Sequence, residues 1–208
     1  MIFRDRESAG RLLANKLLPY GGEDTIVVAL PRGGLPVAKE VAKRLKAPLD
    51  IFFVKKIPSP YNKEAAIGAV SENGYYYVDS YAKNMLGITD SYIDEKAEEI
   101  KKKMAAKRMI YAKTMLPYEG KRIILIDDGV ATGSSMMLAV KALKEEGAKE
   151  VIVAAPVAPA EVAVKLREIA DGAVFLDTPS DFMAVGQFYE DFHQLSDEEV
   201  MDILKEFS

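Results

Sequence analysis

The chain has 208 residues, of which 49% are hydrophobic and 29% charged, and its formal net charge is −4. This length suits one hydrophobic core, and the interspersed charges exclude a domain-wide basic field for nucleic acid or membranes, so a small-molecule partner is favoured. There is no cysteine and a single histidine, His193, which excludes disulfides and thiolate or multi-histidine metal sites and leaves only a hard cation on oxygen ligands.

The N-terminal residues 1–7 are charged where a signal peptide would be apolar. The most apolar run, 151–160, is too short to span a membrane and contains two prolines. We therefore expect a cytoplasmic protein with no membrane partner.

Strand-like and helix-like patterns alternate along most of the chain. Asp5 is placed to cap a helix that continues to Leu18, and further helical patterns cover 35–46, 134–146 and 160–170. Short apolar runs rich in β-branched residues predict buried strands at 25–30, 49–54, 122–127, 151–155 and 173–176. The alternation predicts an α/β fold, a Rossmann-like doubly wound, mainly parallel five-stranded sheet with flanking helices.

Two segments interrupt this alternation within what we expect to be a single domain over residues 1–208. Asn73-Gly74 lies between strand-like flanks in 69–79, which predicts a hairpin that extends the edge of the sheet. Thr89 or Asp90 then caps a long inserted helix over 90–114. The last segment, 177–208, is expected to form a small C-terminal hood and a final helix.

The segment 123–135 combines features of a site for a phosphorylated sugar. A buried strand leads into Asp127 and Asp128, whose carboxylates can accept hydrogen bonds from ribose hydroxyls and hold Mg²⁺ directly or through water. A loop of small residues then opens a helix, where unpaired N–H groups and the helix dipole favour a phosphate. The loop residues are Ala131, Thr132, Gly133, Ser134 and Ser135. No Walker A lysine and no Gly-x-Gly-x-x-Gly is present, so ATPase and dinucleotide sites are disfavoured.

This string of four apolar residues, two acids and a Val-Ala-Thr-Gly-Ser loop closely resembles the motif of type I phosphoribosyltransferases that binds 5-phosphoribosyl-1-pyrophosphate (PRPP). The resemblance implies that Asp127 and Asp128 hold ribose and Mg²⁺ and that residues 131–135 hold the 5-phosphate. It also implies transfer of the phosphoribosyl group to a nitrogen acceptor, with release of pyrophosphate.

Residues 31–34, Pro31, Arg32, Gly33 and Gly34, follow the first predicted strand. If the strand order is 2-1-3-4-5, the first and third strands flank the switch point and their carboxyl ends open on one crevice. The two glycines allow a pyrophosphate to approach the backbone, and Arg32 supplies charge. The segment resembles the pyrophosphate loop of the family, whose non-proline cis peptide would correspond to Pro31–Arg32. A plain strand-to-helix turn is the alternative.

Basic and turn-forming residues follow the second predicted strand. In the family this place holds pyrophosphate ligands and then a flexible loop, so Lys55 and Lys56 are candidate pyrophosphate ligands and 58–64 a candidate lid. We take Asp127, Asp128, Lys56 and Lys63 as the candidate catalytic residues, although Lys63 is as readily explained as a solvated loop charge.

The segment 177–191 resembles the tail of 6-oxopurine transferases, where an aromatic residue and a Val-Gly pair embrace the base, but its register differs by one residue. The candidate acceptor-binding residues are Phe182, Met183, Val185 and Gly186. Because of the shift, either Phe182 or Met183 could stack on a planar acceptor such as a purine.

The favoured interpretation is a Mg²⁺-dependent phosphoribosyltransferase whose partners are PRPP and a small-molecule acceptor, and a homo-oligomer is expected. The alternative is a PRPP-sensing regulator on the same fold that binds nucleic acid through Lys101, Lys102, Lys103, Lys107 and Arg108. Glu95, Glu98 and Glu99 dilute that basic patch, which makes a nucleic-acid partner the less favoured interpretation.

Overall fold

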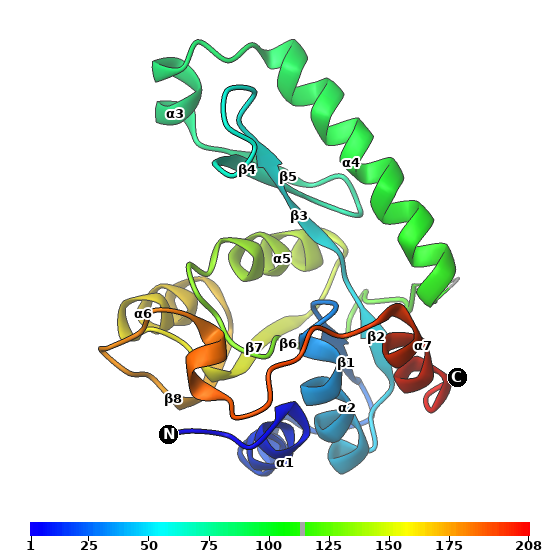
Figure 1. Cartoon of the computed structure of the whole chain (residues 1–208). Coiled ribbons are helices and arrows are strands. Elements are labelled where there is room, and N and C mark those ends of the chain that lie inside the picture. The colour runs from blue at the N-terminus through cyan, green and yellow to red at the C-terminus, as the bar shows by residue number, and fades with distance from the viewer. Residues whose placement is uncertain (113–114) are drawn as a thin grey trace.

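A five-stranded parallel sheet forms the base of the molecule (Figure 1). The structure is a computed structural model that describes residues 1–112 and 115–208. Its strands are arranged in the order β2-β1-β6-β7-β8. Their bounds are β1 Thr25–Ala29, β2 Leu49–Ile51, β6 Arg122–Ile126, β7 Glu150–Val157 and β8 Gly172–Asp177. The predicted α/β class and the expected strand order 2-1-3-4-5 are confirmed.

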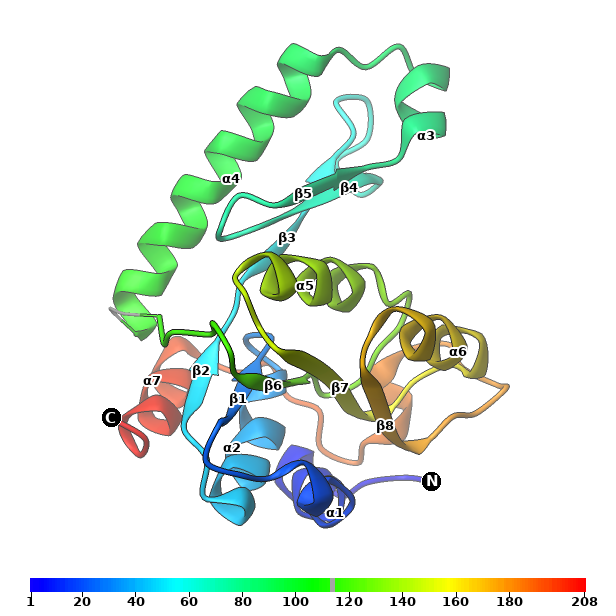
Figure 2. The same ribbon diagram turned by 180° about the vertical axis from the view of Figure 1, so that it is seen from behind.

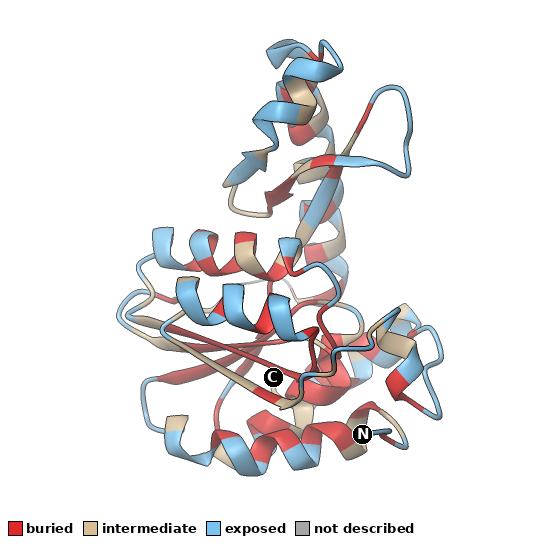
Figure 3. Ribbon diagram, turned by 90° about the vertical axis from the view of Figure 1, so that its left-hand side faces the viewer, coloured by how far each residue is buried: buried red, intermediate tan, exposed pale blue. Residues whose placement is uncertain are grey.

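Helices cover both faces of this sheet (Figures 1 and 2). One layer consists of α1 (Arg6–Leu17) and α2 (Gly34–Leu45), and the other of α5 (Ser134–Glu145) and α6 (Ala160–Ile169). Neighbouring strand residues point to opposite layers: Val27 packs in the core cluster of α1 and α2, and Val28 in that of α5 and α6. The strands are therefore buried between two layers (Figure 3), as their continuous apolar runs predict.

A second, antiparallel sheet stands above the first and corrects one prediction (Figures 1 and 2). Its order is β3-β4-β5, with β3 Val54–Pro58, β4 Ala66–Ser71 and β5 Tyr76–Val78. The hairpin at 69–79 exists, with Gly74 at φ 87° in its turn, but it pairs with β3 and does not extend the large sheet. We call this sheet, α3 (Ser80–Met85) and α4 (Asp90–Tyr111) the α4 lobe.

The predicted strand 49–54 is two strands in the structure. The Phe52 N–H donates to the Ala29 carbonyl at 3.0 Å, which is the last link to the large sheet, and the Phe53 N–H donates to Glu72 Oε1 at 3.0 Å. The chain changes sheet between Phe52 and Phe53. Both residues are nevertheless buried, each in a different core cluster, so the apolar run of the sequence shows no break there. Lys55 and Lys56 consequently lie on β3 in the α4 lobe, not at the end of β2.

The long helix α4 ends at Tyr111, earlier than the predicted end at 114, and Ala112 is extended. Lys113 and Thr114 lie outside the described residues. Helix α3, which Asp79 caps, was not predicted. Across the described part of the chain, no helix is both long enough and apolar enough to span a membrane.

The C-terminal segment returns across the large sheet. It contains the 3-10 turn η2 (Val185–Phe188), a bridge between Tyr189 and Phe3, and the final helix α7 (Asp197–Lys205), which packs against α2 and α4. Ser196 caps α7 by accepting a hydrogen bond from the Glu199 N–H. A further 3-10 turn, η1 (Leu18–Tyr20), follows α1.

A buried ion network fixes the α4 lobe to the large sheet. Arg108 of α4 donates to Asp50 of β2 at 3.0 Å and, through two nitrogens, to Glu72 beside β4 at 2.9 Å. The Tyr118 hydroxyl donates to the second oxygen of Asp50 at 2.6 Å. Burial opposes the charge of Arg108, but the hydrogen bonds and charges of its two carboxylate partners prevail and raise its pKa above the usual value. Two buried carboxylates therefore share one cation, and each of them accepts hydrogen bonds from it.

Candidate active site

The end of β6 presents the two aspartates and the opening of α5. The loop 131–135 follows, in which Thr132 and Ser134 are exposed and their hydroxyl oxygens lie 3.1 Å apart. Gly133 has φ 81°, a conformation that favours glycine, and α5 begins at the next residue. The first N–H groups of this helix have no preceding turn to bond, so the loop can accept a phosphate.

The two aspartates have different environments. Asp128 is buried, and Arg6 Nε donates to its Oδ2 at 2.9 Å. Asp127 keeps partial exposure and accepts a hydrogen bond from the Asp128 N–H at 2.8 Å. Burial, followed by the charge of Asp128, raises the pKa of Asp127 well above its usual value. Asp127 is thus the carboxyl group that gains most from a ligand that supplies positive charge or hydrogen-bond donors.

The 31–34 loop lies directly against the acidic pair. A Cβ at Gly33 would stand 2.2 Å from Asp128 Oδ2, and one at Gly34 would stand 2.6 Å from the Ile126 carbonyl oxygen. Both positions therefore require glycine, because no side chain fits between the two strand ends. The Pro31–Arg32 peptide is cis, at the position that the family resemblance indicates.

Arg32 is exposed and points toward the C-terminal segment. Its guanidinium donates to the Leu195 carbonyl at 2.7 Å, and its Nε lies 4.0 Å from Asp197 Oδ1. The predicted pyrophosphate ligand thus has a carboxylate and a carbonyl as its present partners.

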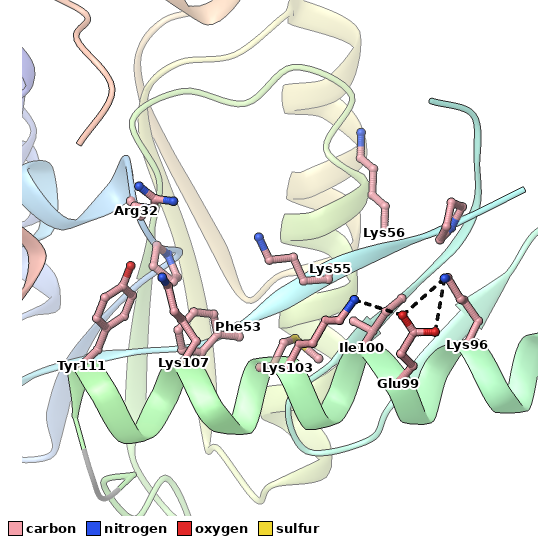
Figure 4. A pocket seen from close by; sticks show the side chains of 13 residues that line it. Arg32, Phe53, Lys55, Lys56, Lys96, Glu99, Ile100, Lys103, Lys107 and Tyr111 are labelled. Atoms are coloured by element: carbon pink, nitrogen blue, oxygen red, sulfur yellow. Dashed lines mark hydrogen bonds and ion pairs between the residues drawn. The ribbon is translucent and has the colours of Figure 1, made fainter. Parts of the chain in front are cut away.

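A cavity of about 500 Å³ opens between the 31–34 loop, β3 and α4 (Figure 4). We call it the basic cleft, because its charged lining consists of Arg32, Lys55, Lys56, Lys96, Lys103 and Lys107 with only Glu99 as an acid. Lys56 also lines a neighbouring cavity of about 520 Å³ with Thr132 and Ser134. Lys56 therefore connects the basic cleft with the 131–135 loop.

Comparisons with known proteins identify the family of this chain. A family model described as phosphoribosyl transferase domain matches residues 6–193. The chain belongs to the phosphoribosyl transferase family. Two curated proteins of Mycobacterium tuberculosis that carry the name Putative phosphoribosyl transferase are 37% identical over 205 residues, which is 98% of this chain and 46% of theirs. The chain therefore spans about half the length of these curated relatives.

Solved structures show the same transferase fold. The protein TT1426 from Thermus thermophilus is 42% identical, covers 100% of both chains and has a TM-score of 0.83. A purine phosphoribosyltransferase from Pyrococcus horikoshii is 18% identical, covers 92% of both chains and has a TM-score of 0.51. The second likeness concerns the fold alone.

The candidate acceptor segment lies across the acidic end of β6. The Tyr189 hydroxyl donates to the Asp128 carbonyl at 2.6 Å, and a Cβ at Gly129 would stand 2.4 Å from a methyl of Val185. Phe182 stacks on Phe188 with ring centroids 5.3 Å apart, whereas Met183 is 86% exposed. The segment thus adjoins the acidic pair, and none of residues 182–189 lines the basic cleft.

Two groups of predicted residues are not brought together in the structure. The turn after β3, which contains Lys63, lies at the end of the small sheet remote from the large sheet (Figures 1 and 2), and Lys63 does not line the basic cleft. The basic residues of the alternative nucleic-acid patch also diverge. Arg108 is buried, Lys103 and Lys107 line the cleft, and Lys102 lies among Asp94, Glu95, Glu98 and Glu99.

The sequence motifs did not identify Arg6 or the cleft lysines of α4. Lys96, Lys103 and Lys107 recur at helical spacing on the face that also carries Ile100 and Met104. The face of a helix that packs on a core is normally apolar, so lysines on that face indicate a binding site that the sequence could have predicted. For Arg6 no comparable signal exists, because the sequence near it also contains Arg4, whose side chain is exposed and pairs with Asp5.

Proposed function

We propose that this protein transfers the 5-phosphoribosyl group of PRPP to a nitrogen acceptor and releases pyrophosphate. The observation that carries the proposal is the contact between Gly33 and Asp128. It supports a single crevice in which a phosphate loop, an acidic pair and a pyrophosphate loop serve one ligand with phosphates at both ends of a sugar. PRPP has that chemistry.

Each part of the crevice has a role in this proposal. Residues 131–135 bind the 5-phosphate through N–H groups and hydroxyls, and Asp127 accepts hydrogen bonds from the ribose hydroxyls. Lys56 lines both cavities, so its positive charge is suited to bind PRPP between the 5-phosphate and the pyrophosphate. Arg32, the 31–34 backbone and Lys55 bind the pyrophosphate.

The chemistry is a displacement at C1 of the ribose. The bond from C1 to the pyrophosphate oxygen breaks, and pyrophosphate leaves with the electron pair. A bond from C1 to the acceptor nitrogen forms, and that nitrogen loses its proton to solvent. The sugar is cationic between the two events. The protein contributes by placing the reactants and by neutralising the charge that develops on the leaving group. Asp128 has a positional role as well, because its pair with Arg6 fixes the end of β6 beside the 31–34 loop.

The donor set fits a magnesium ion that is shared with the substrate. Of the described residues, no group of three or more His, Cys, Asp or Glu could enclose a metal. Mg²⁺, however, is commonly bound by one or two carboxylates together with substrate phosphates and water. Asp127 and Asp128 would hold it directly or through water, and the bound ion would neutralise charge on the departing pyrophosphate.

We further propose a planar heterocycle, most simply a purine, as the acceptor. Residues 182–186 leave β8 and approach the Gly129 side of the acidic pair, where a ring could stack on Phe182 or Met183. This side lies away from the basic cleft, which suits an acceptor that attacks opposite the leaving group.

The decisive assay incubates the purified protein with PRPP, Mg²⁺ and single free bases, and follows pyrophosphate release and nucleotide formation. We expect release with at least one planar base, and loss of release in Asp127→Asn. The matched control is Asp171→Asn, which removes a carboxylate at the opposite end of the sheet and should leave the rate unchanged. Absence of release with every base, or full activity of Asp127→Asn, would overturn the proposal.

A further inference from the structure

The basic cleft carries more positive charge than its own residues neutralise. Glu99 pairs with Lys96 at 3.3 Å and with Lys103 at 3.0 Å (Figure 4). Within the described part of the chain, Lys55 and Lys56 form no ion pair. A cavity of about 500 Å³ with such a lining has the size of a small-molecule site and attracts a multiply charged anion.

The lysines of α4 face this cavity because of the way the helix is anchored. Phe53 and Tyr111 stack with centroids 5.9 Å apart at its lower end, and Met104 is buried beneath it. Lys103 and Lys107 lie on the same side as these anchors, so their charged ends project over β3 and the 31–34 loop (Figure 4). Removing either lysine would leave the apolar anchors in place.

Asp197 places a negative charge at the inner end of the basic cleft. Its carboxylate, in the first turn of α7, lies 2.8 Å from Lys107 Nζ and 4.0 Å from Arg32 Nε, and it accepts a hydrogen bond from the Tyr111 hydroxyl. The hydrogen bonds from Lys107 and Tyr111 lower the pKa of Asp197. An internal carboxylate thus occupies the place where an anionic ligand would meet Arg32 and Lys107.

The basic cleft and the candidate acceptor segment adjoin different parts of the acidic site. In a displacement at C1 the nucleophile approaches from the face opposite the leaving group. The cleft continues from Arg32 and Lys55 on the 31–34 side, whereas residues 182–186 lie on the Gly129 side. Because the cleft shares Arg32 and Lys55 with the pyrophosphate site proposed above, it is on the side of the departing anion in that proposal.

We propose that Lys103 and Lys107 bind the pyrophosphate group together with Arg32 and Lys55, and that this group displaces Asp197 from Lys107 and Arg32. The identity of the anion rests on the proposed function, but its binding can be measured without any transfer reaction. Lys103 and Lys107 are binding residues in this proposal, and Asp197 is a positioning residue that competes with the ligand.

The test is calorimetric titration of the full chain with inorganic pyrophosphate and, separately, with ribose 5-phosphate. We expect Lys103→Gln and Lys107→Gln each to weaken pyrophosphate binding about tenfold, the equivalent of one lost charge-assisted hydrogen bond. Asp197→Asn should tighten it roughly threefold, because a competing carboxylate is removed. Ribose 5-phosphate, which lacks the pyrophosphate, should bind all three variants as it binds the wild type.

Matched controls remove the same charge from the same helices. Lys102→Gln changes the outer face of α4, and Glu198→Gln changes the exposed neighbour of Asp197. Both should leave pyrophosphate affinity unchanged, and thermal melts confirm that each variant is folded. Unaltered affinity in both lysine variants, unchanged or weaker binding by Asp197→Asn, or no pyrophosphate binding by the wild type overturns the inference.

The outcome is distinguishable from that of the proposed function. If pyrophosphate binding follows the expected pattern but no base supports transfer, the cleft is established as an anion site and the transfer reaction is rejected. If transfer occurs while the lysine variants bind pyrophosphate normally, the reaction stands and the role of α4 is rejected.

Discussion

Arg6 Nε donates to Asp128 Oδ2 at 2.9 Å, and this pair joins the start of α1 to the end of β6 across the site. A second nitrogen of Arg6 donates to the His193 carbonyl at 2.8 Å, and its guanidinium lies 4.1 Å from the centroid of the Phe192 ring. One buried cation therefore holds the acidic motif and the C-terminal segment in a common position.

Arg6→Met should destabilise the protein by about 3–5 kcal/mol, because it leaves the Asp128 carboxylate buried without its partner. Chemical denaturation measures the effect. Adding Asp128→Asn to Arg6→Met should restore part of the loss, since the uncompensated charge is then removed. Arg4→Met, at an 81% exposed side chain, is the control. If the double variant is no more stable than Arg6→Met, the ion pair does not account for the loss.

Asp127→Asn should stabilise the fold by roughly 0.5–2 kcal/mol while it abolishes PRPP binding. The pKa of Asp127 in the folded state is raised above its usual value of 3.8. Between these two pKa values the folded state binds more protons than the unfolded state, so the free energy of unfolding falls as pH rises from the lower to the higher value. Asparagine removes the dependence. Denaturation from pH 4 to pH 8 should therefore show a difference between variant and wild type that grows with pH. A wild type that is the more stable at pH 8 would contradict this.

The sequence was informative wherever local chemistry determines the outcome. Continuous apolar runs identified the strands of the large sheet, and Asp5 and Thr89 accept the predicted capping hydrogen bonds. The strand order 2-1-3-4-5, which alternation alone does not fix, was assumed and is the order observed. That order explains why the 31–34 loop and Asp128 could be expected in one crevice from the sequence alone.

The sequence was uninformative where a contact joins distant segments. Phe52 and Phe53 continue the apolar run of β2 although the chain changes sheet there, so no local signal marks the boundary. Arg108, Asp50 and Glu72 look like isolated charges until the α4 lobe folds over them. The same holds for Asp197, whose partners on α4 and in the 31–34 loop are far away in the chain.

Arg108→Met should cost about 3–5 kcal/mol and should loosen the α4 lobe, because Asp50 and Glu72 lose their shared cation. Arg108→Lys should recover little, since an ammonium cannot reproduce the forked contact with Glu72. Limited proteolysis of residues 54–90 and thermal unfolding measure the two effects. Lys102→Met, on the exposed face of the same helix, is the control. Equal proteolysis of Arg108→Met and wild type would exclude this anchoring role.

His193 should titrate above its usual pKa of 6.5, because Glu199 and Asp191 each accept a hydrogen bond from its ring at 3.0 Å. As the only histidine, it gives a single imidazole signal in NMR titrations. Its stabilising contribution is fully present below pH 6.5 and is lost as pH rises through the higher folded value. Glu199→Gln should move the titration toward 6.5, and Glu198→Gln should not. A midpoint at or below 6.5 in the wild type would contradict the contact.

Phe182 and Met183 should separate stability from acceptor binding. Phe182→Ala should lower stability by about 1–3 kcal/mol, because Phe182 stacks on Phe188 and is partly buried. Met183→Ala should leave stability unchanged, since Met183 is 86% exposed.

Truncation of the side chain that stacks on the acceptor should weaken acceptor binding by roughly 1–3 kcal/mol. The affinity for PRPP should stay the same in both variants. Titration of each folded variant with the active base, in the presence of pyrophosphate and ribose 5-phosphate, measures the loss, and Met85→Ala on the α4 lobe controls for removal of an exposed methionine. Unchanged acceptor affinity in both variants would reject residues 182–186 as the acceptor site, because no other side chain of that segment offers a face for a planar ring.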